Sequence, residues 1–255
     1  LVEYLLINFD SNKTITNILN SSEVFIIPLV NPDGRQENIR WNENGIDLNR
    51  NFDIDFGRLR GYSLPLGKLF GRIKISYLPF DLSRGGFIIL HKLFPSFPLW
   101  LTNSGRHAFS EPETQAIRDF MKSLANKDFS FYIDCHTASH NIDSPWHAYK
   151  PPFKITKQEQ YIFDYVTEWV VENTEYEKEA SNLGYKASGN AADWCYKEFR
   201  IPTFGFEILS LYYNSLPPKH DHLVHWMQTT LPVFMYLLAN IDNLRQWKTP
   251  DIQPR

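Results

Sequence analysis

The sequence contains few cysteines, no marked excess of either charge and no apolar run long enough to cross a membrane. Cys135 and Cys195 are its two cysteines; they cannot form a disulfide framework, and their spacing is not that of a cysteine zinc site. The 26 basic and 29 acidic residues give a net charge of -3 without a basic block, which argues against nucleic-acid binding. The most lipid-like stretch, residues 85–101, is interrupted by His91, Lys92 and two prolines. We therefore predict no transmembrane segment.

The composition is that of a globular protein. Hydrophobic residues make up 43% of the 255 positions and aromatic residues 15%, which is enough for a substantial core. No internal repeat or linker divides the chain, so we assign residues 1–255 to a single domain. The chain begins without methionine and inside an amphipathic helical pattern, and we expect a segment upstream of Leu1 to be missing. The oligomeric state stays open, and we favour a secreted or cell-surface protein over a cytoplasmic one.

Apolar runs alternate with helical patterns along the chain. Three runs are typical of buried strands, at residues 23–30, 129–135 and 203–209. Helical patterns occupy residues 110–126, 158–179, 190–198 and 222–241, the last of them interrupted by Pro232. This alternation predicts an α/β fold with a mixed, mostly parallel twisted sheet flanked by helices.

Two local motifs predict the start of a helix and a turn, and one long segment shows neither helical nor strand periodicity. Ser110, with Glu113 three residues later, forms a capping-box motif, and we predict that Ser110 caps the helix that follows. "NPDG" at residues 31–34 predicts a turn in which Gly34 takes a positive φ. Residues 53–109 show no sustained period, so we interpret them as a long loop insertion over one face of the domain.

The stretch "RWNENGIDLNRNF", residues 40–52, contains two arginines and four asparagines. A guanidinium group matches a carboxylate through two donors, and asparagine adds a donor of fixed geometry. The stretch, with Arg40, Asn49 and Arg50 among its donors, therefore predicts a site that holds an anion.

Further candidates lie at the ends of predicted strands. Glu207 lies inside the apolar run "TFGFEIL", where a carboxylate is costly unless it is paired, metal-linked or catalytic. A glutamate in a salt bridge at the exposed end of the strand is the alternative. His136 follows the run 129–135 and can be structural or a metal ligand, but one histidine cannot supply the roughly three protein ligands of a zinc site. Because ligands gather beyond the carboxyl ends of strands in open α/β sheets, we expect these residues and Tyr185 to converge with the polar stretch.

Together these residues resemble the zinc carboxypeptidase family of the carboxypeptidase A and B type. The similarity runs in order through "NPDG", "RWNENGIDLNRNF", "FSEPETQAI", "DCH", "YKASGNAADWCY" and "FGFEI" and covers nearly the whole chain outside residues 53–109. The resemblance implies hydrolysis of the C-terminal peptide bond of peptides or proteins, with one zinc ion as cofactor.

The resemblance also implies how the substrate is held. Asn49 and Arg50 would bind the C-terminal carboxylate, and Tyr185 would close over it. Ala192 occupies the position that lines the base of the pocket for the terminal side chain. A small apolar residue there argues against a preference for Lys or Arg and favours apolar or aromatic C-terminal residues.

The catalytic residues implied by the resemblance are Arg40, Glu207 and His136. Arg40 would stabilise the oxyanion, and Glu207 would be the general base that returns its proton to the leaving amine. His136 would be one zinc ligand. The family takes its other two zinc ligands from an HxxE segment, and the sequence contains no HxxE. We expect that segment to lie upstream, so that the fragment as given coordinates zinc incompletely and is inactive.

Two other functions share part of this pattern. A related zinc amidohydrolase acting on cell-wall peptides or N-acyl amino acids would need the same metal and base, although Tyr185 with Asn49 and Arg50 favours a peptidase. A non-catalytic binder of peptide C-termini would keep the carboxylate-binding residues but has no use for Glu207 or Arg40.

Overall fold

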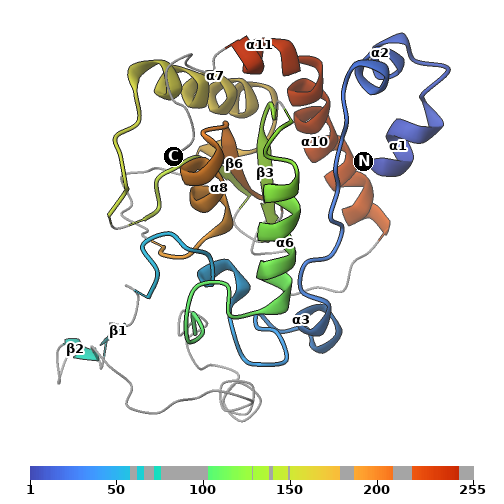
Figure 1. The fold of residues 1–255 in the computed structure, drawn as a ribbon. Coiled ribbons are helices and arrows are strands. Elements are labelled where there is room, and N and C mark those ends of the chain that lie inside the picture. Colours follow the sequence, from blue (N-terminus) through green and yellow to red (C-terminus); the bar gives the residue numbers. More distant parts are fainter. Residues whose placement is uncertain are drawn as a thin grey trace.

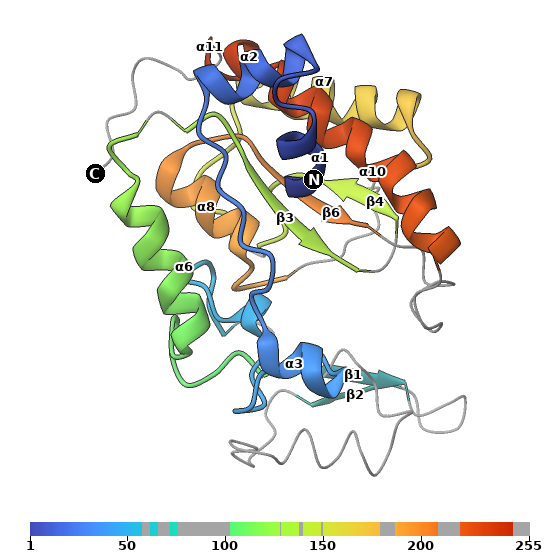
Figure 2. The same ribbon diagram turned by 90° about the vertical axis from the view of Figure 1, so that its right-hand side faces the viewer.

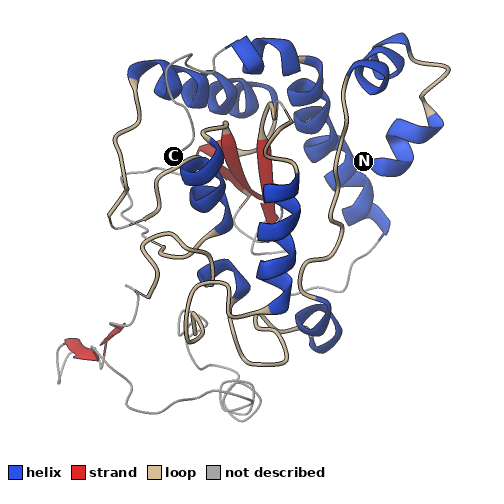
Figure 3. Ribbon diagram, in the orientation of Figure 1, coloured by secondary structure: helices blue, strands red, loops and turns tan. Residues whose placement is uncertain are grey.

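The computed structural model describes residues 1–57, 62–65, 72–75, 103–127, 129–137, 140–148, 150–178, 187–208 and 220–246. In this part of the chain, helices surround a small central sheet (Figure 3). Tyr185 and most of the predicted insertion at residues 53–109 lie outside the described residues. The single-domain assignment with its loop insertion therefore stays a prediction.

The central sheet is mixed, as predicted. Its strand order is β3-β6-β4-β5, with bounds Tyr132–His136 for β3, Thr203–Glu207 for β6, Asn141–Asp143 for β4 and Glu177–Lys178 for β5. The pairs β3·β6 and β4·β5 are parallel, and β4·β6 is antiparallel. A separate antiparallel pair joins β1 (Tyr62–Pro65) to β2 (Arg72–Ile75) within the predicted insertion.

Helices cover both faces of the sheet. Figure 2 shows α7 (Lys157–Asn173) and α10 (His220–Ala239) on one side, and α6 (Pro112–Ser123) and α8 (Ala191–Phe199) on the other. The remaining helices are short: α1 (Val2–Ile7), α2 (Lys13–Ser21), α3 (Pro32–Glu37), the 3-10 turn η1 (Leu48–Arg50) and α11 (Ile241–Gln246). No helix in the described ranges combines the length and the apolarity needed to cross a bilayer.

Two packed clusters hold the sheet between these helices. On one face, Val166 of α7 and Leu237 of α10 are fully buried against Phe204 of β6. On the other face, the rings of Phe52, Phe109 and Trp194 lie within 5.3 to 5.5 Å of one another. The second cluster fastens the polar stretch at residues 40–52 to α8, because Phe52 ends that stretch and Trp194 belongs to the helix.

The prediction of a buried strand at residues 23–30 is wrong for the described structure. None of these residues is in a strand; Val24 is partly buried, and five other apolar side chains are 37 to 51% exposed: Phe25, Ile26, Ile27, Leu29 and Val30. A strand is stable only as part of a hydrogen-bonded ladder, and the described sheet begins at β3 without pairing to this segment. The apolar composition indicated a segment that could form a strand, but it could not indicate whether another strand lies beside it to pair with.

Two predictions about local motifs are also wrong. Helix α6 begins at Pro112 with Glu111 as its N-cap, and Ser110 instead donates from Oγ to Oε1 of Glu111 at 2.7 Å. Gly34 lies inside α3 without a positive φ, and its N–H donates to the N-cap Asn31 at 2.9 Å. Glycine is needed there for space, since a Cβ atom would lie 2.3 Å from Nδ2 of Asn31.

Candidate active site

The two predicted residues at strand ends lie side by side. His136 ends β3, Glu207 ends β6, and the parallel register pairs them directly. The N–H of Ile208 donates to the carbonyl oxygen of His136 at 2.8 Å, so the ladder continues just beyond both residues. Paired residues of parallel strands point to the same face, so the imidazole and the carboxylate share one side of the sheet.

Asn49 reaches this pair from the polar stretch. Its Nδ2 lies 3.0 Å from Nε2 of His136, although the two residues are 87 positions apart. Its Oδ1 accepts a bond of 2.8 Å from the N–H of Ala191, the first residue of α8. Because only the amide oxygen can accept that bond, the NH₂ group faces the imidazole. One side chain thus connects η1, β3 and α8.

Asp134 is a partner of His136 that the sequence analysis missed. Its Oδ2 lies 2.9 Å from Nε2 of His136. Burial lowers the pKa of His136, but the charge and hydrogen bond of Asp134, with further charge from Glu207 and Asp143, outweigh burial and raise that pKa to about 9. The signal was present in "DCH", because residues two apart on a strand share a face.

Nε2 of His136 makes both of these contacts, so Nδ1 is the ring nitrogen that would bind a metal ion. A histidine that binds zinc usually donates its other N–H to a carboxylate or carbonyl, and His136 with Asp134 fits that arrangement. Among the residues that the structure describes, no group of three or more His, Cys, Asp or Glu could hold a metal ion. His136 therefore stays a candidate ligand, and the residues that the structure describes do not group three such side chains around it.

Arg40 and Arg50 lie around a buried carboxylate, that of Asp47. Arg40 Nε donates to Oδ2 of Asp47 at 2.6 Å, and the N–H of Asn49 donates to Oδ1 at 3.2 Å. Burial raises the pKa of Asp47, but the charges of Arg40 and Arg50 outweigh burial and hold the pKa below its usual range. Arg50 is 4% exposed, and its Nη1 donates to the carbonyl oxygen of Asn49 at 2.6 Å. Asp47, which the sequence analysis also missed, therefore ties Arg40 to the backbone of Asn49.

Two of the four asparagines in the polar stretch bind a carboxylate of the protein itself. Asn42 and Asn44 each donate from Nδ2 to Oε2 of Glu111 at 2.8 Å. Burial raises the pKa of Glu111, but these bonds and one from Ser110 outweigh burial and lower the pKa. Part of the predicted anion-binding capacity thus attaches the loop to the start of α6, and Asn49 is the asparagine that reaches His136.

The start of α8 is held against the polar stretch by close backbone packing. Gly189 exchanges two backbone hydrogen bonds, of 2.8 and 3.0 Å, with residues 52–54. Its φ is +71°, and a Cβ atom would lie 2.2 Å from the carbonyl oxygen of Arg50, so the position requires glycine. Ala192 follows in the first turn of α8 and is 6% exposed. The predicted pocket residue therefore belongs to the same helix that Asn49 contacts.

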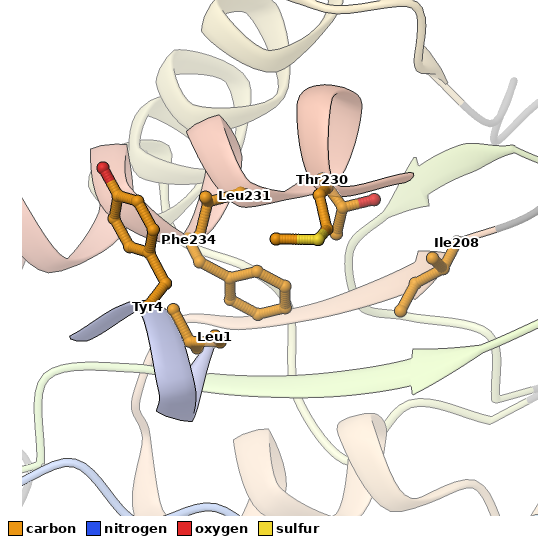
Figure 4. A pocket seen from close by; sticks show the side chains of 7 residues that line it. Leu1, Tyr4, Ile208, Thr230, Leu231 and Phe234 are labelled. Carbon is orange, nitrogen blue, oxygen red and sulfur yellow. The ribbon is translucent and has the colours of Figure 1, made fainter. Parts of the chain in front are cut away.

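An apolar pocket of about 150 Å³ lies between α1 and α10, beside the residue that follows Glu207 (Figure 4). Its lining contains no charged side chain and consists of Leu1, Tyr4, Ile208, Met227, Thr230, Leu231 and Phe234. The polar cluster around His136 is therefore a separate feature, and the pocket contributes none of the residues that the sequence predicted.

Comparisons with known proteins identify the family of the chain. The sequence profile described as zinc carboxypeptidase matches residues 1–230. Carboxypeptidase A1 from Bos taurus is 22% identical over an alignment of 272 positions, which covers 93% of this chain and 52% of that protein. Carboxypeptidase D from Anas platyrhynchos is 37% identical over 65 residues, which cover 22% of this chain and 5% of that protein. The chain spans about half the length of the carboxypeptidase A relatives that it matches.

A solved structure shows the same fold at low sequence identity. Thrombin activatable fibrinolysis inhibitor aligns with a TM-score of 0.64 and 20% identity, covering 96% of this chain and 57% of its own. The α/β fold with a mixed sheet is thereby confirmed. Since the family profile covers most of the sequence, the chain belongs to the zinc carboxypeptidase family.

Proposed function

We propose that this protein is a zinc-dependent metallocarboxypeptidase that hydrolyses the C-terminal peptide bond of peptides or proteins, with apolar or aromatic C-terminal residues preferred. The observation that carries the proposal is the convergence of His136, Glu207 and Asn49 at the carboxyl ends of two parallel strands. Family membership supports the reaction type. The side-chain preference rests on Ala192.

Substrate binding would depend on Asn49 and Arg50, with Tyr185 as a third contact. When Nε2 of His136 carries a proton that Asp134 accepts, Nε2 cannot also accept a bond from Nδ2 of Asn49. The Asn49 amide then has a donor for an external carboxylate. Arg50 lies next in sequence and adds the positive charge that distinguishes a carboxylate from a neutral amide.

Hydrolysis would use Glu207 and Arg40. Glu207 would accept the proton of the attacking water and return it to the leaving amine nitrogen. Arg40 would donate to the oxyanion that forms as the carbonyl becomes tetrahedral. Zinc, when bound with His136 as one ligand, supplies Lewis acidity to the carbonyl and lowers the pKa of water to about 7.

The experiment is a peptide panel with free C-termini ending in Phe, Leu, Lys or Glu, together with measurement of zinc content. It uses residues 1–255 and, in parallel, the protein with any coding sequence upstream of Leu1. We expect release of Phe and Leu by a zinc-containing protein. We also expect Glu207→Gln to abolish release while zinc and peptide binding remain, and C-terminal amidation to block release.

Two results would contradict the proposal. If no form binds zinc or releases amino acids, yet both retain peptides through free C-termini, the protein is a binder of peptide ends. If cell-wall peptides or N-acyl amino acids are hydrolysed and amidation of the peptide panel makes no difference, the protein is an amidohydrolase.

A further inference from the structure

Four aromatic rings form a continuous row across α7 and α10, far from the polar cluster. Tyr161, Tyr165 and Trp169 follow one another at a spacing of four residues on α7, and Tyr236 of α10 joins them. Ring centroids are 6.3 Å apart for Tyr161 and Tyr165, 6.5 Å for Tyr165 and Tyr236, and 3.6 Å for the parallel pair Trp169 and Tyr236. We name these four residues the aromatic row.

At the outer end of the aromatic row, the side chains lie in solvent and do not fill the core. Tyr161 is 60% exposed and Tyr165 is 37% exposed. At its inner end, Trp169 and Tyr236 pack against the core, whereas the fully or nearly fully buried side chains of α7, Phe163, Val166 and Val170, lie on a neighbouring face of the helix. Large aromatic side chains held together in water mark an interaction surface more often than isolated exposed residues do.

The charge beside the aromatic row is mostly negative, with Lys157, four residues before Tyr161 at the start of α7, as the exception. Residues 158–177 include six acidic residues and no Lys or Arg, and α10 also contains no Lys or Arg. Glu168 lies three residues after Tyr165, and Glu172 lies three residues after Trp169, so each carboxylate neighbours a ring on the helix surface. Both glutamates are exposed. The surface therefore combines ring faces with negative charge.

We infer that the aromatic row with Glu168 and Glu172 is a docking surface for a basic, Lys/Arg-rich peptide segment. A guanidinium or ammonium group is attracted to the face of Trp or Tyr, and its charge can pair with a carboxylate beside the ring. Figure 1 shows α7 at the top of the molecule, whereas the blue segment around residues 48–50, which contains Asn49, lies in the lower half below α8. A basic segment on this surface would therefore leave the site for the peptide C-terminus open.

Two other occupants fit these observations less well. A neutral carbohydrate could stack on the rings but would gain nothing from the acidic side chains. A second copy of the chain, docked through the same face, would bring Glu168 and Glu172 close to their own equivalents, and like charges repel. A cationic segment uses both features of the surface.

The test is fluorescence anisotropy with a labelled peptide of alternating Lys and Arg, nine residues long and amidated at its C-terminus. Tyr161→Ser with Tyr165→Ser should weaken binding by about 5- to 30-fold, since each exposed cation–aromatic contact contributes a few-fold. Tyr161→Phe with Tyr165→Phe should retain binding because the rings remain. Glu168→Gln with Glu172→Gln should weaken binding and reduce its salt dependence.

Matched controls lie on the N-terminal part of the chain. Leu6→Ser with Ile7→Ser removes two exposed apolar side chains, and Glu3→Gln with Asp10→Asn removes two exposed charges. Both should bind the peptide as the unchanged protein does, and so should Glu207→Gln. The inference is overturned if the Ser pair binds normally, if the controls lose binding equally, if a neutral hexasaccharide displaces the peptide, or if the Ser pair converts a dimer into a monomer.

Discussion

Glu159→Gln should destabilise the protein in a pH-dependent way. Glu159 lies in the first turn of α7, and its Oε2 accepts bonds from the backbone N–H and the hydroxyl of Thr156 at 2.8 and 2.7 Å. Its Oε1 accepts a bond from Nη2 of Arg200, the residue that follows the end of α8. The carboxylate therefore closes the capping box of α7 and joins two helices on opposite faces of the sheet.

The magnitude follows from these bonds. A hydrogen bond to a charged group contributes about 1.5 to 3 kcal/mol, and the change to Gln removes the charge and replaces one acceptor with a donor. Arg200 would keep a charge whose partner has become neutral. We expect a loss of about 2 kcal/mol in the free energy of unfolding at neutral pH.

The sign of the pH dependence follows from the pKa of Glu159. Burial raises this pKa, but the Thr156 bonds and the charge of Arg200 outweigh burial and lower it in the folded protein. A folded pKa below the unfolded one gives stability that is fully present above the unfolded pKa and is lost as the pH falls through the folded value. The difference between the two proteins should therefore shrink below about pH 4.

Urea unfolding followed by circular dichroism measures the loss in the free energy of unfolding at about pH 7 and its decrease at about pH 3.5. Glu172→Gln, on the exposed side of the same helix, is the control and should change stability by less than about 0.5 kcal/mol. Equal stability of Glu159→Gln and the unchanged protein at neutral pH would refute the reasoning. A difference that stays constant down to the lower pH would refute the part that depends on charge.

Two further predictions concern the candidate active site. Gly189→Ala should lower the free energy of unfolding by about 2 kcal/mol or more, because a Cβ atom would meet the carbonyl oxygen of Arg50 at a positive φ, and an unchanged melting temperature would contradict this. In the metal-free protein, Asp134→Asn should lower the pKa of His136 from about 9 toward its ordinary value, measured by NMR titration of the imidazole C–H protons. Asp143→Asn should give a smaller decrease, and equal effects of the two changes would show that the contact at Nε2 is not the main cause.

The local sequence predicted those helices and strands whose apolar pattern or run lies entirely within the element itself. The helical pattern at 158–179 corresponds to α7, "NAADWCYKE" to α8, and the apolar runs before His136 and around Glu207 to β3 and β6. In α7 the buried side chains of Ile162, Phe163, Val166 and Val170 recur at helical spacing, and β6 is buried at four consecutive positions, as a continuous apolar run predicts. The run at 23–30 had the same apolar signal, but a strand also needs a neighbour, which a local pattern cannot supply.

The sequence by itself determined the positions of α6, α7, α8, α10, β3 and β6 along the chain and the residue types of the candidate site. The tertiary structure decided which of those residues meet: the register of β3 and β6 pairs His136 with Glu207, and Asn49 bridges to positions 87 and 142 residues away. It also assigned Asn42 and Asn44 to Glu111, which a reading of the polar stretch alone gave to an external anion. The physical reason is that a hydrogen bond depends on the position of both partners in space, whereas periodicity along the chain records only which side of its own element a residue occupies.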